Sequence, residues 1–345
     1  MTANRGLPRD AAYFVEQLRA LALEMRDAVG RGVRASTIEE LSASTGERGG
    51  DTVYRLDEHG EGALLTYCAR WGEDLPFLLV AEGLEGGRQV FPDGADPARL
   101  AFTLIVDPVD GTRGLMYGKR SAWALFGVAP PPSAHDGYYP TLADISVALQ
   151  AELPTARAAL ADVLWAARGE GLGAETHDLR AGTTTPFAPR PSRATTLAGG
   201  FAAISKFFPG GKAAAARLEE SLYLTLLGPP PTESPQVFDD EYIASGGQLY
   251  ELMVGHDRFL ADLRPLLHAP SEGVPRLCCH PYDLCTWIIA HEAGVIVTDA
   301  HGETLAAPLD TTSPVAWVGY ANDTLRGDIE PALRLLLNEL IVDSR

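Results

Sequence analysis

The sequence of 345 residues lacks any apolar run that approaches the ~20 residues needed to span a bilayer. Its first twenty residues contain acidic side chains and no apolar segment typical of a secretory signal peptide. No internal repeat is visible either. From these absences we expect a cytoplasmic protein without a membrane-spanning helix.

Cysteine is scarce, with four in the chain: Cys68, Cys278, Cys279 and Cys285. They form no CxxC pair, and two adjacent cysteines are poorly spaced for a disulfide or a zinc site. We therefore expect thiols that are buried or idle. A zinc site made by Cys278, His280 and Cys285 is the alternative interpretation.

Basic side chains are few as well, because 28 Lys and Arg face 46 Asp and Glu, for a formal net charge of -18. Such a surface repels the phosphates of nucleic acids and anionic lipids, so we expect neither among the partners. An acidic protein that handles small anions needs local positive charge, which a bound metal supplies. The alternative interpretation is that the excess of acidic residues only keeps the protein soluble, which agrees equally well with the net charge.

The sequence does contain the alternation of short apolar runs and helical patterns that is typical of α/β or α+β layering. Asp10 is the expected N-cap of the first helix, and Gly30 and Gly32 are its expected end. Residues 176–197 are rich in Thr, Pro and Arg, which predicts a loop or domain crossing. The expected helices are 10–30, 211–228, 247–255, 283–294 and the last twenty residues. The expected strands are 77–81, 102–106, 122–129, 144–149, 162–168 and 295–299.

Carboxylates stand at the ends of these elements. Glu82 follows the run 77–81, Asp107 and Asp110 follow 102–106, and Asp283 begins a predicted helix. Several carboxylates brought together repel one another unless they are protonated or bound to metal. Hard oxygen ligands suit Mg²⁺, so the pattern predicts a magnesium site.

The hexapeptide DPVDGT begins at Asp107. Pro108 is expected to turn the chain, so that Asp107, the Val109 carbonyl and Asp110 face one small volume. The two residues that follow offer backbone N–H groups and a hydroxyl to a phosphate. An ordinary turn is the alternative, because Asp-Pro and Asp-Gly are common turn material.

The segment DPVDGTRG, with Glu82 behind a strand upstream, resembles the inositol monophosphatase/fructose-1,6-bisphosphatase superfamily. The downstream segments YDLCTWIIAHEAGVIVTDAHGETL and AWVGYANDTL fall in the order that this superfamily shows. The resemblance runs from the first helix nearly to the C-terminus. It implies an αβαβα sandwich of the sugar-phosphatase type. One compact unit would then contain a half at 1–175 with the DPVDGT site and a half at 176–345 with Asp283 and substrate contacts.

The resemblance also implies a Mg²⁺-dependent phosphomonoesterase with two ions, or three. Glu82, Asp107 and the Val109 carbonyl would hold the first ion. Asp107, Asp110 and Asp283 would hold the second. The implied catalytic residues, which act on the attacking water, are Thr112, Asp57 and Glu82. The implied contacts to phosphate and substrate are Gly111, Thr112, Arg113 and Arg258.

Several positions depart from the superfamily pattern. Gly83 stands where a second acid usually follows Glu82, which leaves the third ion and the strength of the activity open. Tyr54 replaces a usual threonine near Asp57, Tyr282 replaces a tryptophan, and Val295 replaces a glycine. A non-catalytic member with a binding role is therefore one alternative.

The leading function is hydrolysis, by metal-activated water, of a small phosphorylated polyol or sugar of the inositol monophosphate or fructose bisphosphate type. The segment DGTRGLMYGKR is closer to the DGTKGF form of 3'(2'),5'-bisphosphate nucleotidases, which is the second alternative. In that case Arg113, Lys119 and Arg120 are candidates to receive a second phosphate. A homodimer is an expectation from the resemblance.

Overall fold

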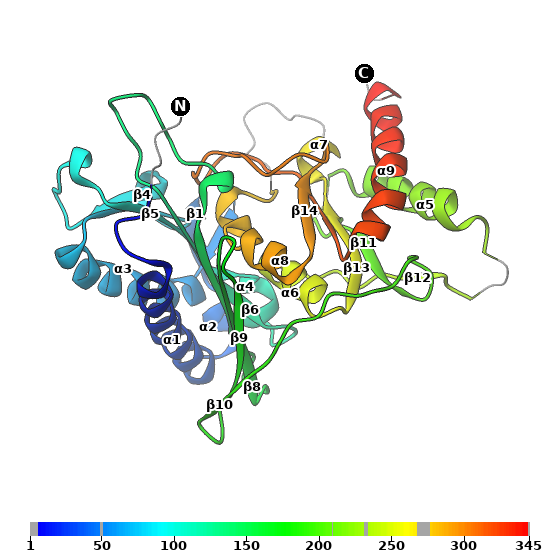
Figure 1. Cartoon of the computed structure of the whole chain (residues 1–345). Helices are drawn as coiled ribbons and strands as arrows, with labels where there is room; N and C mark the ends of the chain where they lie inside the picture. The colour runs from blue at the N-terminus through cyan, green and yellow to red at the C-terminus, as the bar shows by residue number, and fades with distance from the viewer. Residues whose placement is uncertain (1–5, 49–50, 209, 231–233, 268–276, 344–345) are drawn as a thin grey trace.

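The computed structural model describes residues 6–48, 51–208, 210–230, 234–267 and 277–343, with the side chains of 45–53 and 341–343 excepted. The first twenty residues, in which we expect no signal peptide, are described from residue 6 onward. The described chain forms five layers, in which two β-sheets are separated and covered by helices (Figure 1). The predicted αβαβα sandwich is thereby confirmed.

The first sheet has eight strands in the order β10-β9-β8-β7-β6-β5-β3-β4. Strands β3 and β5 are parallel, so their carboxyl ends lie at the same edge of the sheet, whereas the other neighbours are antiparallel. The strand expected at 144–149 begins later, behind a 3₁₀ turn at Leu142–Asp144. The strands are β3 Phe77–Ala81, β4 Arg88–Phe91, β5 Phe102–Asp110, β6 Ala122–Ala129, β7 Val147–Leu153, β8 Leu160–Ala167, β9 Gly171–Asp178 and β10 Thr183–Pro186.

Strand β5 does not turn at Pro108, as the sequence predicted, but continues to Asp110. The turn comes at Gly111, whose φ of 93° lies in the left-handed region that favours glycine. Asp107 lies opposite Leu125 of β6 and Asp110 opposite Trp123, so three steps along β5 match two along β6. Residues three apart in a regular strand point to opposite faces, and this one-residue bulge places both aspartates on the same face.

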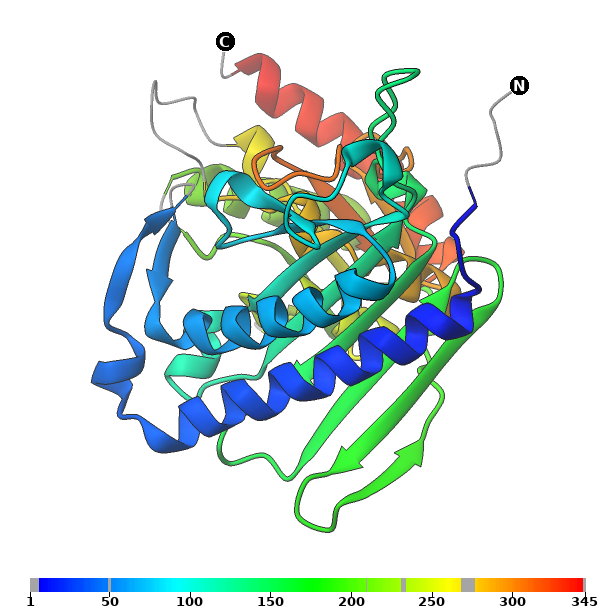
Figure 2. The same cartoon turned by 90° about the vertical axis from the view of Figure 1, so that its left-hand side faces the viewer.

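Two long helices cover the outer face of this sheet, α1 Ala11–Ala35 and α3 Arg55–Asp74 (Figure 2). Asp10 caps α1 as predicted, since its side chain accepts from the Tyr13 N–H. The helix does not end at Gly30 or Gly32. A β-carbon at Gly32 would lie 2.3 Å from the His59 ring of α3, so this glycine permits close packing of two helices.

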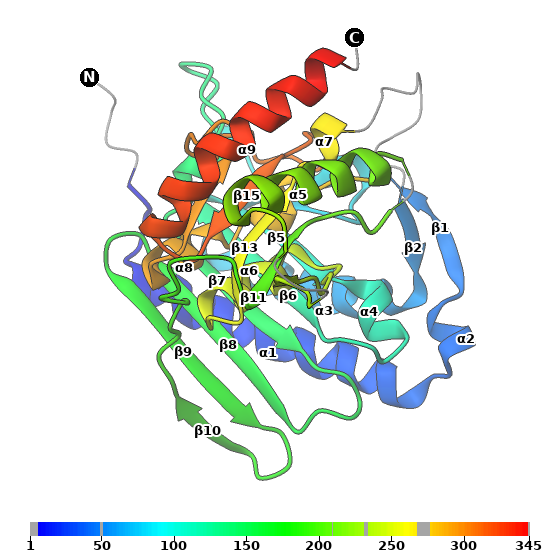
Figure 3. The same cartoon turned by 90° about the vertical axis from the view of Figure 1, so that its right-hand side faces the viewer.

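The second sheet has five strands in the order β12-β11-β13-β15-β14. Helices α5 Lys212–Leu227 and α9 Asp323–Asp343 cover its outer face (Figure 3). Both were predicted, and Gly228 ends α5 with a φ of 71°. The strands are β11 Gly200–Ile204, β12 Val237–Phe238, β13 Asp257–Asp262, β14 Ile296–Asp299 and β15 Trp317–Tyr320.

The central layer consists of α6 Ser245–Met253, the 3₁₀ turn η4 Pro281–Leu284 and α8 Trp287–Ala293. Its apolar side chains share one buried cluster with both sheets, including Leu125 of β6, Leu249 of α6 and Leu260 of β13. Asp283 is the third residue of η4 rather than the N-cap of a longer helix.

The predicted division at residue 175 falls inside β9, and the first sheet continues to Pro186. The expected loop at 176–197 therefore begins with a β-hairpin, which its β-branched threonines favour. No helix in the described ranges is long and apolar enough to cross a membrane. The remaining elements are α2 Ile38–Leu41, β1 Ser44–Arg48, β2 Asp51–Tyr54, α4 Thr112–Met116 and α7 Arg264–Leu267.

Candidate active site

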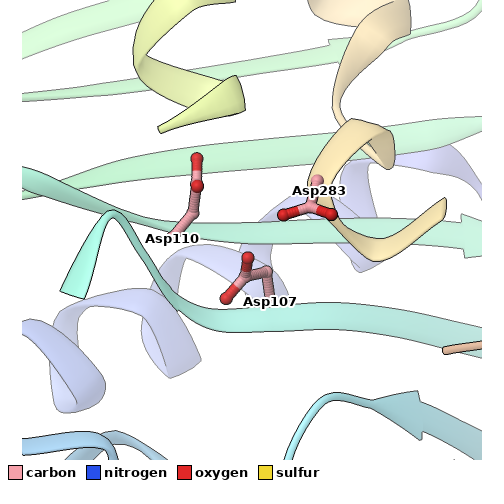
Figure 4. Close-up of side chains that lie close together, drawn as sticks. All are labelled: Asp107, Asp110 and Asp283. Atoms are coloured by element: carbon pink, nitrogen blue, oxygen red, sulfur yellow. The ribbon is translucent and has the colours of Figure 1, made fainter. Parts of the chain in front are cut away.

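Three carboxylates meet where the end of β5 faces the turn η4 (Figure 4). Asp107 and Asp110 come from the end of β5, and Asp283 comes from η4. One carboxylate oxygen of each lies within 4.8 Å of an oxygen of the other two. Asp107 and Asp110 are only 2% and 6% exposed. The structure thus brings together three predicted ligands that are up to 176 residues apart in the chain (283 − 107).

Backbone N–H groups hold each carboxylate in place. The Ser245 N–H donates to Asp110 Oδ1 at 3.2 Å, and the Gly246 N–H donates to Asp110 Oδ2 at 2.6 Å. These groups belong to the first turn of α6, which sequence reasoning did not connect with the site. The Val109 N–H donates to Asp107 at 3.0 Å, and the His280 N–H donates to Asp283 at 2.6 Å.

Burial raises the pKa of each of these carboxyl groups, and the charge of a nearby carboxylate raises it further. Burial raises the pKa of Asp110 to about 7, against the two N–H bonds that lower it. The pKa of Asp107 lies well above its usual range because of burial and then the charge of Asp110. The pKa of Asp283 is also well above its usual range, from burial and from Asp110. Two buried carboxylates and a half-buried one repel one another at this distance when all are ionised, a compensating cation removes that cost, and their hard oxygen donors fit Mg²⁺.

The predicted pair of Thr112 and Asp57 is also brought together. The Thr112 hydroxyl lies 2.8 Å from Asp57 Oδ1 and 2.8 Å from the Val109 carbonyl oxygen. Asp57 is fixed in the first turn of α3, where it accepts the Tyr54 N–H at 2.8 Å. The hydroxyl has one proton for two acceptors, and the charged carboxylate is the stronger of them. The Val109 oxygen then keeps its lone pairs for another partner.

Glu82 follows β3 and lines the same cavity, although it lies outside the trio of Asp107, Asp110 and Asp283. Its charge contributes to the raised pKa of both Asp107 and Asp110. Gly83 has a φ of 89°, a conformation that L side chains rarely adopt. An acid at this position would therefore strain the backbone, which gives a physical reason for the departure from the superfamily pattern.

The cavity above these residues has a volume of about 710 Å³. Gly111, Thr112 and Arg113 line it, and their contact with phosphate stays a prediction. Arg258 does not line it, and its guanidinium donates instead to the carbonyl oxygens of residues 196 and 198. The predicted substrate contact of Arg258 is therefore replaced by a structural one. The sequence did not indicate three further lining residues, which are Phe207, Phe208 and Arg264.

The alternative zinc site is not assembled. In the described part of the chain, the side chains close enough to share a metal ion in a group of three are the aspartates of the trio, not Cys278, His280 and Cys285. Cys285 is fully buried, and Cys278 lies in the cavity wall with its sulfur 4.0 Å from His280 Nε2. All four cysteines are free thiols.

The fold and the site together define a class of protein, the αβαβα sandwich with a carboxylate trio at the edge of two parallel strands. Solved structures share this fold over nearly the whole chain. Leishmania major fructose-1,6-bisphosphatase in its holo form superposes with a TM-score of 0.66 at 16% identity, covering 95% of this chain and 96% of that chain. Extragenic suppressor protein suhB from Bartonella henselae has a TM-score of 0.62 at 15% identity, covering 93% and 98%.

No protein-family model and no curated protein sequence matches this chain. The structural likeness nevertheless confirms the fold that the DPVDGT motif predicted, that of the inositol monophosphatase/fructose-1,6-bisphosphatase superfamily.

Proposed function

We propose that this protein is a Mg²⁺-dependent phosphomonoesterase that hydrolyses a small phosphorylated polyol or sugar. The observation that carries the proposal is the trio of Asp107, Asp110 and Asp283, two of them buried and one half-buried, directly beside the Gly111–Thr112 turn. The trio offers oxygen ligands to divalent cations, and Gly111 begins the short helix α4 at the cavity wall. Ligands for a metal ion and N–H donors for a phosphate therefore lie at one place, which supports the proposal.

Each residue has a distinct part in this proposal. Glu82, Asp107 and the Val109 carbonyl would hold one ion, and Asp107, Asp110 and Asp283 would hold a second. When bound, such ions lower the pKa of a water molecule and stabilise the leaving oxygen. Gly83 replaces the usual second acid, so we propose two ions rather than three.

Asp57 and Thr112 orient the attacking water in this proposal. The Thr112 hydroxyl donates its proton to Asp57 Oδ1, so the lone pairs of the hydroxyl oxygen can accept a hydrogen from water. The proton released during attack then has a path through Thr112 to the Asp57 carboxylate. No protein nucleophile is required.

The proposal is tested by phosphate release from inositol 1-phosphate, fructose 1,6-bisphosphate and adenosine 3',5'-bisphosphate, with Mg²⁺ and with a chelator. We expect release that depends on Mg²⁺ and is abolished in Asp107→Asn, because the shared ligand loses its charge. Asp93→Asn, an exposed acid outside the cavity, is the matched control and keeps full activity. Calorimetric Mg²⁺ titration of both variants reports metal binding independently of turnover.

Equal turnover of Asp107→Asn and the unaltered protein would contradict this site. A complete lack of release from all esters, with or without metal, would favour the non-catalytic alternative. The bisphosphate nucleotidase alternative is supported if adenosine 3',5'-bisphosphate is the preferred ester. The cytoplasmic location and the homodimer stay predictions.

A further inference from the structure

Besides the three aspartates, the cavity is lined by Arg113, Phe208 and Arg264, and we call these three residues the second wall. The guanidinium carbons of both arginines lie 5.4 Å from the centroid of the same Phe208 ring. Arg113 comes from α4 in the first half of the chain, whereas Phe208 and Arg264 come from the second half. The wall therefore exists only in the folded protein.

Arg264 is held rigidly in this wall. Its side chain pairs side-on with Asp262, with Nε 2.8 Å from Oδ1 and Nη2 2.5 Å from Oδ2. Nη1 donates to the Leu277 carbonyl at 3.1 Å, and the Phe207 ring centroid lies 4.5 Å from the guanidinium carbon. Arg264 is 7% exposed and Asp262 is fully buried. A guanidinium that is already ordered loses little side-chain entropy when a ligand binds.

The pairing with Asp262 leaves one edge of the Arg264 guanidinium for a ligand. A guanidinium has five N–H donors, and within the described residues the Asp262 carboxylate and the Leu277 carbonyl occupy the one on Nε, one on Nη2 and one on Nη1. One N–H on each Nη remains. Charged N–H donors of a planar guanidinium suit the oxygens of a phosphate or a carboxylate.

Arg113 is positioned by aromatic rings next to the catalytic pair. Its guanidinium carbon lies 5.5 Å from the Tyr54 ring centroid and 5.4 Å from that of Phe208. Arg113 directly follows Thr112, and the Tyr54 N–H holds Asp57, the acceptor of the Thr112 hydroxyl. Tyr54, which departs from the superfamily pattern, thus contacts both the catalytic pair and the second wall.

We propose that Arg113 and Arg264, arranged against Phe208, form a subsite for a second anionic group of the substrate. The preferred substrates are then phosphomonoesters that carry a further phosphate or carboxylate. This inference rests on the proposed phosphatase activity. It also revises the prediction that Arg113, Lys119 and Arg120 together receive a second phosphate. Arg120 instead pairs with Asp240 and Glu251, and neither Arg120 nor Lys119 is among the residues that line the cavity.

The test compares esters that share the scissile phosphate and differ in the second group. Inositol 1-phosphate is paired with inositol 1,4-bisphosphate, and adenosine 3'-phosphate is paired with adenosine 3',5'-bisphosphate. Fructose 1-phosphate is paired with fructose 1,6-bisphosphate, and glycerol 2-phosphate with 2-phosphoglycerate, which tests a carboxylate. We expect a KM lower by about tenfold or more for the doubly charged member of at least one pair, with a similar kcat, as charged hydrogen bonds allow.

Three variants test the residues. Arg113→Gln is expected to raise KM for the doubly charged ester by a larger factor than KM for the singly charged ester, and so to remove most of the KM advantage of the doubly charged ester. Arg264→Gln leaves Asp262 buried without a partner, so Asp262→Asn/Arg264→Gln is the variant that keeps the fold testable. Lys119→Gln removes a nearby charge that does not line the cavity and is the matched control.

The outcomes separate this inference from the proposed function. Release from both members of every pair with equal KM, unaffected by the arginine variants, overturns the subsite and leaves the phosphatase. Where no ester is hydrolysed, calorimetric titration with the same pairs measures their affinities directly. Equal affinities for singly and doubly charged esters then overturn the subsite as well. Tighter binding of the doubly charged esters, lost in Arg113→Gln, supports it without turnover.

Discussion

At the residue scale, the contact between Thr112 and Asp57 joins two segments that are 55 residues apart. The Thr112 hydroxyl lies at the start of α4, and Asp57 lies in the first turn of α3. Their geometry depends on two local features, the left-handed Gly111 and the Tyr54 N–H that holds Asp57.

If this hydroxyl orients the attacking water, Thr112→Val lowers kcat by about a hundredfold or more, the range of general acid–base contributions. Valine keeps the shape of threonine but cannot accept or donate a proton. Thr112→Ser keeps the hydroxyl and is expected to retain most of the activity. Steady-state kinetics on the best ester measures both variants, and equal kcat in Thr112→Val and the unaltered protein would exclude the assigned role.

Asp257 of β13 allows a prediction about stability and pH. Burial, and then the charges of Glu251 and Asp240, raise its pKa to about 7, while His256 and Arg120 act in the opposite direction. The folded protein keeps this proton to higher pH than the unfolded chain, whose carboxyl titrates near its usual value of 3.8. The contribution of Asp257 to stability therefore decreases as the pH rises from about 4 to about 7.

Asp257→Asn removes that loss. We expect the variant to be more stable than the unaltered protein by about 1–4 kcal/mol at pH 8, and similar to it at pH 4. Urea unfolding at the two pH values measures the difference. A variant that is equally stable, or less stable, at pH 8 would show that the ionised carboxylate is better solvated than its burial indicates.

At the scale of elements, the bulge in β5 decides the geometry of the site. The sequence DPVDGT predicted that Asp107 and Asp110 act together, but it assigned their convergence to a turn at Pro108. The structure reaches the same convergence by one extra residue in the strand, opposite Leu125 and Trp123. A bulge depends on the neighbouring strand, and the sequence of β5 alone does not reveal it.

The packing of α1 on α3 supports the same sheet from outside and depends on Gly32. Gly32→Ala is expected to destabilise the protein by about 1–3 kcal/mol, because the new methyl group would overlap the His59 ring. Gly62→Ala in α3 is the matched control, since no atom lies within 4 Å of its added β-carbon. That control is expected to gain about 0.5–1 kcal/mol from lower chain entropy. Thermal unfolding of both variants checks the contrast, and equal shifts would contradict the close packing.

At the scale of the whole molecule, one buried cluster joins the two sheets through the central helices, and each sheet has a further cluster under its outer helices. Leu125 and Leu164 of the first sheet, Leu249 and Trp287 of the central helices, and Leu260 of the second sheet all belong to the cluster that joins the sheets. Neither half can bury these side chains alone. The cavity wall repeats the pattern, since Arg113 and Phe208 come from different halves.

We therefore expect a single cooperative unfolding transition for the full chain. Tryptophan fluorescence, which reports on Trp123 and Trp287 among others, and far-ultraviolet circular dichroism are expected to give the same urea midpoint. Two separate transitions would indicate that the halves are stable without their shared core.

Sequence alone determined the order of most strands and helices. The spacing of apolar residues and the capping residues, such as Asp10 and Gly228, are local features that a sequence records. It also indicated the acids of the trio, because DPVDGT contains Asp107 and Asp110 and the downstream segment YDLCTW contains Asp283. Only the tertiary structure placed Arg264 and Phe208 in the cavity, excluded Arg258 from it, and showed why residue 83 is glycine. Those properties depend on contacts between residues far apart in the chain, or on a backbone angle, and a linear pattern records neither.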